Sequence, residues 1–351
     1  KGWEHVAEFV PGGASVNGGF EGDEVYSSYD QFGAAVAISP DWVVVSASFD
    51  TASTGKVSLF WMKDVLNGGR LIPDAELVPP DGAYGMRFGS SVAIDRNTLV
   101  VGAMRDRSKV GSVYVFRYSG GNWVMSVKLA PDDASADSQG NFGSCVAISD
   151  GIVVVGAPYD GTNGRRRNGS VYVYADNGSG LTYSLIQKIV PLDLLEGDQF
   201  GFSIDVEEST NPSTSAREVR LAVGARFDDD KGQDSGSVYT YLKTEGDSQF
   251  LFDRKLTSSN WSPGAELGTS VALHKRDLVA GAKKQGGSGS AHRFRHDGIS
   301  WMGAGVVTEG KSGDDFGSAV ALEEGVAVVG SHSDDSVGAN GGALYSYAVC
   351  D

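Results

Sequence analysis

A phrase of the form FGSSVAIDRNTLVVGAMRD, at residues 88–106, occurs six times along this chain with small changes. Each copy opens with Phe-Gly or Leu-Gly, and the six anchors are Phe32, Phe88, Phe142, Phe200, Leu267 and Phe316. A repeat of this length cannot bury its own apolar face, so each copy must pack on its neighbours. The phrase therefore predicts a repeat architecture, in which the loops rather than the strands carry the function.

Each unit holds four apolar stretches of strand length that end in turn residues. In the second unit these are residues 71–78, 88–95, 98–103 and 111–117, and none has helical periodicity. Successive anchors lie 49 to 67 residues apart, which is the size of a four-stranded antiparallel blade. We therefore predict an all-β fold, a six-bladed β-propeller that forms a single domain over residues 1–351.

The two ends of the chain are predicted to share the sixth blade. Residues 3–10, from Trp3 to Val10, resemble the strand that leads every later unit, whereas no such strand follows the last unit. When this N-terminal strand joins the sheet that begins at Phe316, the ring closes without a covalent bond and leaves no exposed sheet edge.

The formal net charge is −16, from 29 basic and 45 acidic residues. Such a chain repels phosphate backbones, so nucleic acid is not expected as a partner. Because no apolar run is long enough to span a bilayer, direct membrane insertion is not expected either. The chain begins at Lys1 rather than Met, which suggests a processed or excised segment that belongs to a larger chain or assembly.

The sequence contains two cysteines. Cys145 occupies a strand position that small residues fill in the other units, so we interpret it as a buried packing residue. A disulfide to Cys350 is not favoured, because the two cysteines belong to different units. Pairing of Cys350 outside this segment stays open.

The copies resemble the FG-GAP repeat, whose pattern is FGxSVAI…VVGAP…D…GSVYVF. The closest copy is the third, with FGS at 142–144, GAP at 156–158 and GSVY at 169–172. Repeats of this family form the propellers of integrin α-subunits and occur in many secreted proteins. The resemblance implies cell adhesion or ligand recognition outside cells.

Integrin-type repeats often carry a calcium loop of the form DxDxDG between the FG strand and the GAP strand. Here the corresponding connections are short turns, such as residues 95–97 and 149–151. They offer too few oxygen atoms for the roughly six to eight ligands of calcium. No metal or cofactor is therefore predicted, and the acidic loops are where calcium would bind if the protein takes it up.

The loops after the GA strands and those before the FG strands are expected to share one face. An acidic residue follows nearly every GA pair, at Asp50, Asp106, Asp160, Asp228 and Asp334, with Gln285 in the fifth unit. One interpretation is a face that binds a cation or a basic ligand. The other is that each Asp caps its own turn, and the recurrence favours it because structural roles repeat while binding sites seldom do.

Residues that differ between the units are the better candidates for specificity. The candidate ligand-binding residues are Asp160, Arg165, Arg166, Arg167, Asp228, Asp229, Asp230, Asp234, Asp106, Asp334 and Trp261. Trp261 has two interpretations, an exposed platform for a sugar or an anchor of its own loop. Glycosylation sequons begin at Asn168, Asn177 and Asn260, and they favour a glycoprotein in an extracellular or cell-surface location.

No catalytic residues are predicted, since the five His residues are scattered and neither a nucleophile elbow nor a phosphate-binding loop is present. The sequence therefore predicts a recognition or adhesion module that binds a protein or glycan on its loop face. The alternatives are lectin-type carbohydrate binding, a structural subunit of a larger extracellular assembly and, last, an enzyme that acts on polysaccharides.

Overall fold

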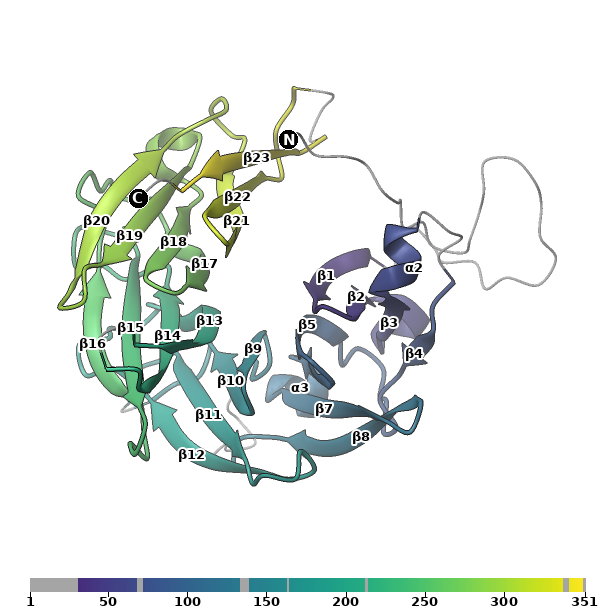
Figure 1. The fold of residues 1–351 in the computed structure, drawn as a ribbon. Coiled ribbons are helices and arrows are strands. Elements are labelled where there is room, and N and C mark those ends of the chain that lie inside the picture. The colour runs from purple at the N-terminus through teal and green to yellow at the C-terminus, as the bar shows by residue number, and fades with distance from the viewer. Residues whose placement is uncertain are drawn as a thin grey trace. The chain divides into compact units, whose positions relative to one another are not determined.

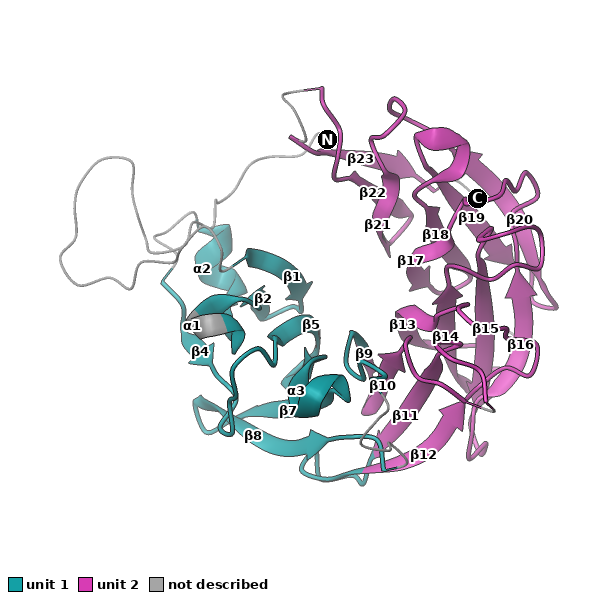
Figure 2. Cartoon of the chain, turned by 180° about the vertical axis from the view of Figure 1, so that it is seen from behind, with its two compact units in different colours: residues 1–146, 176–183 teal, residues 147–175, 184–351 magenta. Residues whose placement is uncertain are grey.

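The computed structural model describes residues 31–67, 72–132, 139–162, 164–211, 214–336 and 341–349. These residues form 23 strands and only short helical turns, so the protein is all-β, as predicted. The strands form six antiparallel sheets (Figure 1), which are the blades of a β-propeller. The chain divides into two compact units, residues 1–146 with 176–183 and residues 147–175 with 184–351 (Figure 2). The prediction of a single domain stays a prediction.

The first unit contains the first two blades. The first blade consists of β1 (Phe32–Ile38), β2 (Trp42–Ala47), β3 (Lys56–Trp61) and β4 (Ala75–Leu77). The second blade consists of β5 (Phe88–Asp95), β6 (Thr98–Ala103), β7 (Ser112–Ser119) and β8 (Asn122–Leu129). Short helices lie in the connections, namely α1 (Asp50–Ser53), α2 (Met62–Leu66) and α3 (Asp106–Lys109).

The remaining blades belong almost wholly to the second unit. The third has β9 (Cys145–Ser149), β10 (Ile152–Ala157), β11 (Ser170–Asp176) and β12 (Tyr183–Ile189). The fourth has β13 (Phe200–Thr210), β14 (Arg217–Ala225), β15 (Ser237–Thr244) and β16 (Leu251–Leu256). The fifth has β17 (Leu267–His274), β18 (Asp277–Ala282), β19 (Ser290–His296) and β20 (Trp301–Val307), with the 3₁₀ turn η2 (Gln285–Gly287).

The sixth sheet has three strands among the described residues. They are β21 (Phe316–Glu323), β22 (Val326–Ser331) and β23 (Ala343–Ala348). The strand predicted to complete this blade, residues 3–10, lies outside the described residues.

Each blade is offset by one strand from the sequence repeat. The strand that leads a sequence unit pairs with the last strand of the preceding unit, as β8 pairs with β7 through Lys128 and Tyr114. The leading strand predicted at residues 71–78 is shorter than expected and becomes β4 of the first blade. A blade therefore runs from one FG anchor to the leading strand of the next unit, and this pairing decides which side chains meet.

The repeated glycines let neighbouring blades approach closely. A Cβ atom on Gly224, in the GA pair of the fourth blade, would lie 2.1 Å from the carbonyl oxygen of Gly268 in the FG pair of the fifth. Phe200 of the fourth blade is fully buried and forms a backbone bridge with Gly169 of the third. Cys145, interpreted from the sequence as a buried packing residue, is half-buried.

Candidate functional site

The carboxylates that follow the GA strands are bound within their own blades. In the fourth blade, Asp228 Oδ2 accepts a hydrogen bond of 3.1 Å from the Tyr239 hydroxyl and lies 2.7 Å from Lys255 Nζ. The same ammonium lies 4.9 Å from the centroid of the Tyr239 ring. Because Asp228 is only 1% exposed, its carboxylate faces these partners rather than solvent.

The arrangement recurs in the second and third blades. Asp160 Oδ2 lies 2.9 Å from Lys188 Nζ and accepts a hydrogen bond of 2.7 Å from the Ser170 hydroxyl. In the second blade, Asp106 Oδ2 lies 2.7 Å from Lys128 Nζ. Both carboxylates are buried, and both contact side chains of their own blade.

The first and sixth blades keep part of this set of contacts around the acid. In the first blade the cation sits on the third strand, where the buried Lys56 Nζ lies 3.5 Å from Asp50 and 3.1 Å from Glu76. In the sixth, Asp334 Oδ2 accepts a hydrogen bond of 2.8 Å from the Tyr345 hydroxyl. The acid that follows the GA pair thus keeps a partner from its own blade although the residue types change.

The second oxygen of these carboxylates caps the turn. Asp228 Oδ1 accepts a hydrogen bond of 3.0 Å from the backbone N–H of Asp230, and Asp334 Oδ1 accepts one of 2.7 Å from Ser336. The capping interpretation anticipated this contact but missed the Tyr and Lys partners. A signal for them was present, since a Tyr recurs in the GSVY strands and a Lys recurs near the end of the leading strands.

In the fourth-blade cluster, burial and the neighbouring carboxylates shift the pKa values of Lys255 and Tyr239. Burial alone would lower the pKa of Lys255, but its contacts with Asp228, Asp230 and Asp193 outweigh burial and raise that pKa above its usual range. Burial, and then the neighbouring carboxylates, raise the pKa of Tyr239, so this hydroxyl keeps its proton at neutral pH. The cluster is therefore a stable structural ion pair rather than a group poised for proton transfer.

The fifth blade replaces the charged cluster with a neutral one. Gln285 stands where the other blades carry Asp, and its Oε1 lies 2.7 Å from His292 Nε2 and 2.8 Å from the Ser290 hydroxyl. Because an amide oxygen only accepts, Nε2 of His292 carries the proton. Burial lowers the pKa of His292 to about 4, so the imidazole is neutral at neutral pH. The Gln285 amide also donates a hydrogen bond of 2.7 Å to the backbone carbonyl of Asn260.

The Arg cluster of the third blade is anchored to the segment that precedes the fourth FG strand. Arg165 donates hydrogen bonds to the carbonyl oxygens of Leu194 and, at 3.4 Å, of Leu192. The side chains of Arg166 and Arg167 are exposed. One arginine thus holds the loop while the next two face solvent.

The segment around Leu194 presents two apolar side chains to solvent. Leu194 is fully buried, whereas Leu192 is 90% exposed and Leu195 is 50% exposed. Between them, Asp193 Oδ2 lies 3.0 Å from the Tyr239 hydroxyl, whose single proton is shared between Asp193 and Asp228. The two leucines therefore lie on a segment that is held in place (pinned) by contacts with Arg165 and with Tyr239. Sequence reasoning missed them because it looked for charged and aromatic residues.

Asp198 joins this segment to the acidic loop of the fourth blade. Its Oδ2 accepts a hydrogen bond of 2.6 Å from the backbone N–H of Leu195, and its carbonyl accepts one of 3.3 Å from Phe227. Burial, and then the charges of Asp228 and Asp229, raise the pKa of Asp198 to about 7. We call residues 165–167, 192–198 and 227–234, which these bonds connect, the loop cluster.

The acidic residues of the loop cluster differ in their accessibility. Asp229 and Asp230 are exposed, and Asp234 is half-buried. Asp229 Oδ1 accepts a hydrogen bond of 2.7 Å from the backbone N–H of Asp234, while Asp230 also contacts Lys255. The structure thus brings the blade-specific Arg and Asp residues predicted from the sequence into one connected group of loops, to which Trp261 contributes through Gly232.

The described residues carry neither a metal cluster nor a membrane helix. In the residues that the structure describes, no group of three or more His, Cys, Asp or Glu side chains is arranged to hold a metal ion. Within the same ranges, no helix has the length and hydrophobicity needed to cross a bilayer.

The sequence model of the FG-GAP repeat matches residues 24–60, 73–116, 123–174, 183–241 and 307–347, which is more than half of the chain. The chain belongs to the FG-GAP repeat family. Propellers of this family are generally binding modules rather than catalysts, and the repeats are typical of extracellular or surface proteins. The matched ranges leave out residues 242–306, which contain most of the fifth blade.

A solved structure agrees with the fold. The chain is similar to Saccharomyces cerevisiae Sqt1, with a TM-score of 0.50 and 10% sequence identity, over 92% of this chain and 84% of that one. At this identity the likeness shows the fold alone. No curated protein sequence matches the chain significantly.

Proposed function

We propose that this FG-GAP propeller is a non-catalytic, extracellular recognition or adhesion module that binds a protein partner through the loop cluster. The observation that carries the proposal is the pair of exposed leucines, Leu192 and Leu195, on a segment pinned by Arg165, Asp193 and Asp198. Because hydrogen bonds already hold this segment in place, covering its exposed apolar side chains with a partner costs little ordering entropy.

The surroundings of the leucines favour a protein as the ligand. Arg166 and Arg167 belong to the loop on one side, and Asp229 to the loop on the other. An apolar centre with a polar rim is the usual anatomy of a protein interface, and charges of both signs set the orientation of the partner. The recurring Asp residues contribute less, because their carboxylates are buried in the blade clusters.

The proposal is tested by binding to an array of purified secreted and cell-surface proteins. The test variant is Leu192→Ser with Leu195→Ser, and the matched control is Leu251→Ser, a leucine that is 61% exposed on β16. Since buried apolar contacts at an interface centre contribute about 1 kcal/mol or more each, the double variant should lose at least about tenfold in affinity. The control variant should bind as the wild type does.

A charge reversal gives a second readout. Arg166→Glu with Arg167→Glu should slow association at low salt, because rim charges act mainly on the association rate. The proposal is wrong if no protein on the array binds selectively, or if the leucine variant keeps the affinity of the wild type.

A further inference from the structure

The fifth blade lacks the side chains that fill the edge of the second and fourth blades. In the fourth blade, Tyr239 on the third strand lies opposite Lys255 on the outer strand, and the second blade has the same pair of residue types. In the fifth blade, His292 lies opposite Val306. A long cation is therefore replaced by a short apolar side chain at the same register.

A second position of the outer strand, the one that pairs two residues further along the third strand, is emptied as well. The residue that occupies it is Phe252 in the fourth blade and Met125 in the second, but Gly303 in the fifth. A Cβ atom on Gly303 or on Gly305 would meet no described atom within 4 Å. The sheet is thus intact while the space that large side chains fill elsewhere stays open.

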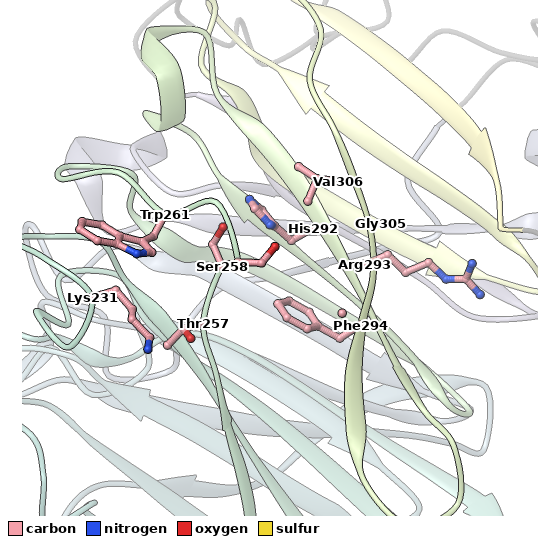
Figure 3. A pocket seen from close by; sticks show the side chains of 11 residues that line it. Lys231, Thr257, Ser258, Trp261, His292, Arg293, Phe294, Gly305 and Val306 are labelled. Atoms are coloured by element: carbon pink, nitrogen blue, oxygen red, sulfur yellow. The ribbon is translucent and has the colours of Figure 1, made fainter.

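A cavity of about 550 Å³ lies at this place (Figure 3). Its wall in the fifth blade includes His292, Phe294 and Val306, and its opposite wall comes from the loops that follow the second and fourth strands of the fourth blade. Gln285 supports this opposite wall, because its amide both accepts from His292 and donates to the carbonyl of Asn260. An Asp at this position, as in the other blades, could not donate that second bond.

Trp261 and Lys231 form one side of the cavity (Figure 3). The Trp261 indole is 47% exposed, and a Cβ atom on Gly232 would lie 2.8 Å from its ring, so the indole packs on the backbone next to Lys231. Lys231 is exposed, and among the described residues no carboxylate lies within ion-pair distance of its ammonium. This distinguishes it from Lys255, which contacts three carboxylates.

We propose that this cavity binds a carbohydrate that carries a carboxylate, such as a uronic acid residue. The apolar face of a pyranose ring suits the half-exposed Trp261 indole, which offers a flat amphipathic surface. The sugar carboxylate pairs with Lys231, and the hydroxyl groups of Thr257 and Ser259 bind ring hydroxyls. The neutral His292 adds no charge, and the second cation of the lining, Arg293, is paired with Asp277 at 2.7 Å, so Lys231 sets the preference for an acid.

The test is calorimetric titration of the full chain with methyl glucuronide and methyl galacturonide, each compared with its parent glucoside or galactoside. The wild type should bind the uronides about tenfold more tightly than the parents, which corresponds to one charge-assisted contact. Trp261→Ala should weaken both classes by about tenfold or more. Lys231→Met should weaken only the uronides and remove the preference.

Two further variants separate binding from folding. Gly303→Met places the residue of the second blade into the open space and should abolish binding without lowering the melting temperature. Lys63→Met changes a lysine that lies 5.2 Å from the Trp61 ring in the first blade, outside the cavity, and should leave binding unchanged.

Several results would overturn the sugar site. They are equal binding of uronides and parents by the wild type, no binding of either, or unchanged binding by Trp261→Ala. The sugar site shares Lys231 with the loop cluster, but neither Leu192 nor Leu195 lines the cavity, so the Leu192→Ser, Leu195→Ser variant should keep its sugar affinity. Loss of sugar binding therefore does not count against the protein interface, nor does the reverse.

Discussion

The hydroxyl of Ser203 donates a hydrogen bond of 2.7 Å to the carbonyl oxygen of Gly268, and this bond joins the first strands of two neighbouring blades. Ser270 makes the same bond to Gly317, at 2.9 Å, one blade further along. The close approach of the FG and GA glycines places the carbonyl within reach of the hydroxyl. The bond is thus a repeated connection between blades, at a strand position that the sequence alone marks only as small.

Ser203→Ala should lower the free energy of unfolding by about 1–2 kcal/mol, because the variant leaves the Gly268 carbonyl without its side-chain donor. Urea unfolding followed by circular dichroism measures the loss. Ser259→Ala, at an exposed position, is the control and should cost almost nothing. Equal stability of the two variants would show that the bond contributes nothing.

Gly224→Ala should be more damaging, because its Cβ atom would lie 2.1 Å from the Gly268 carbonyl oxygen. Forcing atoms into a filled space costs about 1–3 kcal/mol and displaces the neighbouring blade. Gly303→Ala is the matched control, a strand glycine whose Cβ atom would meet nothing within 4 Å. A melting temperature for Gly224→Ala as high as that of the control would contradict this account.

Lys255→Met should lower the free energy of unfolding by about 3–5 kcal/mol, because it leaves the buried Asp228 carboxylate without its cation. Adding Asp228→Asn should recover most of the loss, since a neutral amide needs no counter-charge. Chemical denaturation of the two variants and the wild type measures the coupling. The fifth blade, with Gln285 and Val306 at these positions, shows that a neutral version of the cluster folds. Additive losses in the double variant would argue against the ion pair.

Asp198 should make stability depend on pH. Its pKa of about 7 in the folded protein exceeds the value of about 3.9 for an unfolded Asp. Its contribution to stability is therefore fully present below about pH 4 and is lost as the pH rises through about 7, because only the folded state holds the proton in that window. Asp198→Asn removes this titration, so the variant should gain stability relative to the wild type between these pH values. Unfolding curves whose difference is independent of pH would refute this assignment.

The three sequons should differ in glycan occupancy when the protein is secreted from a glycosylating cell. Asn168 is 1% exposed, and its amide bonds to the Thr162 hydroxyl at 2.7 Å, whereas Asn177 and Asn260 are exposed. Peptide mass spectrometry should therefore find glycans at Asn177 and Asn260 and none at Asn168. A glycan on Asn168 would mean that its turn is glycosylated before the blade folds.

Much of the fold follows from the sequence because its determinants are local. The FG and GA pairs occur in each blade since a large anchor and small neighbours are both needed where two blades meet, as with Phe200, Gly224 and Gly268. Counting the anchors therefore predicts the number of blades. The turn-capping role of the recurring Asp residues is local too, because each caps a backbone group within a few residues, as Asp228 caps Asp230.

The tertiary structure alone decided which of these residues are accessible. Asp228 is buried because Lys255 reaches it from the outer strand, 27 positions away in the chain, and only the strand pairing brings the two together. The exposure of Leu192 depends on bonds from Arg165, and the cavity beside Trp261 depends on the register of Gly303 opposite Phe294. Burial and open space arise from pairing between strands that are distant in the sequence. They therefore cannot be predicted from the residue pattern of one strand.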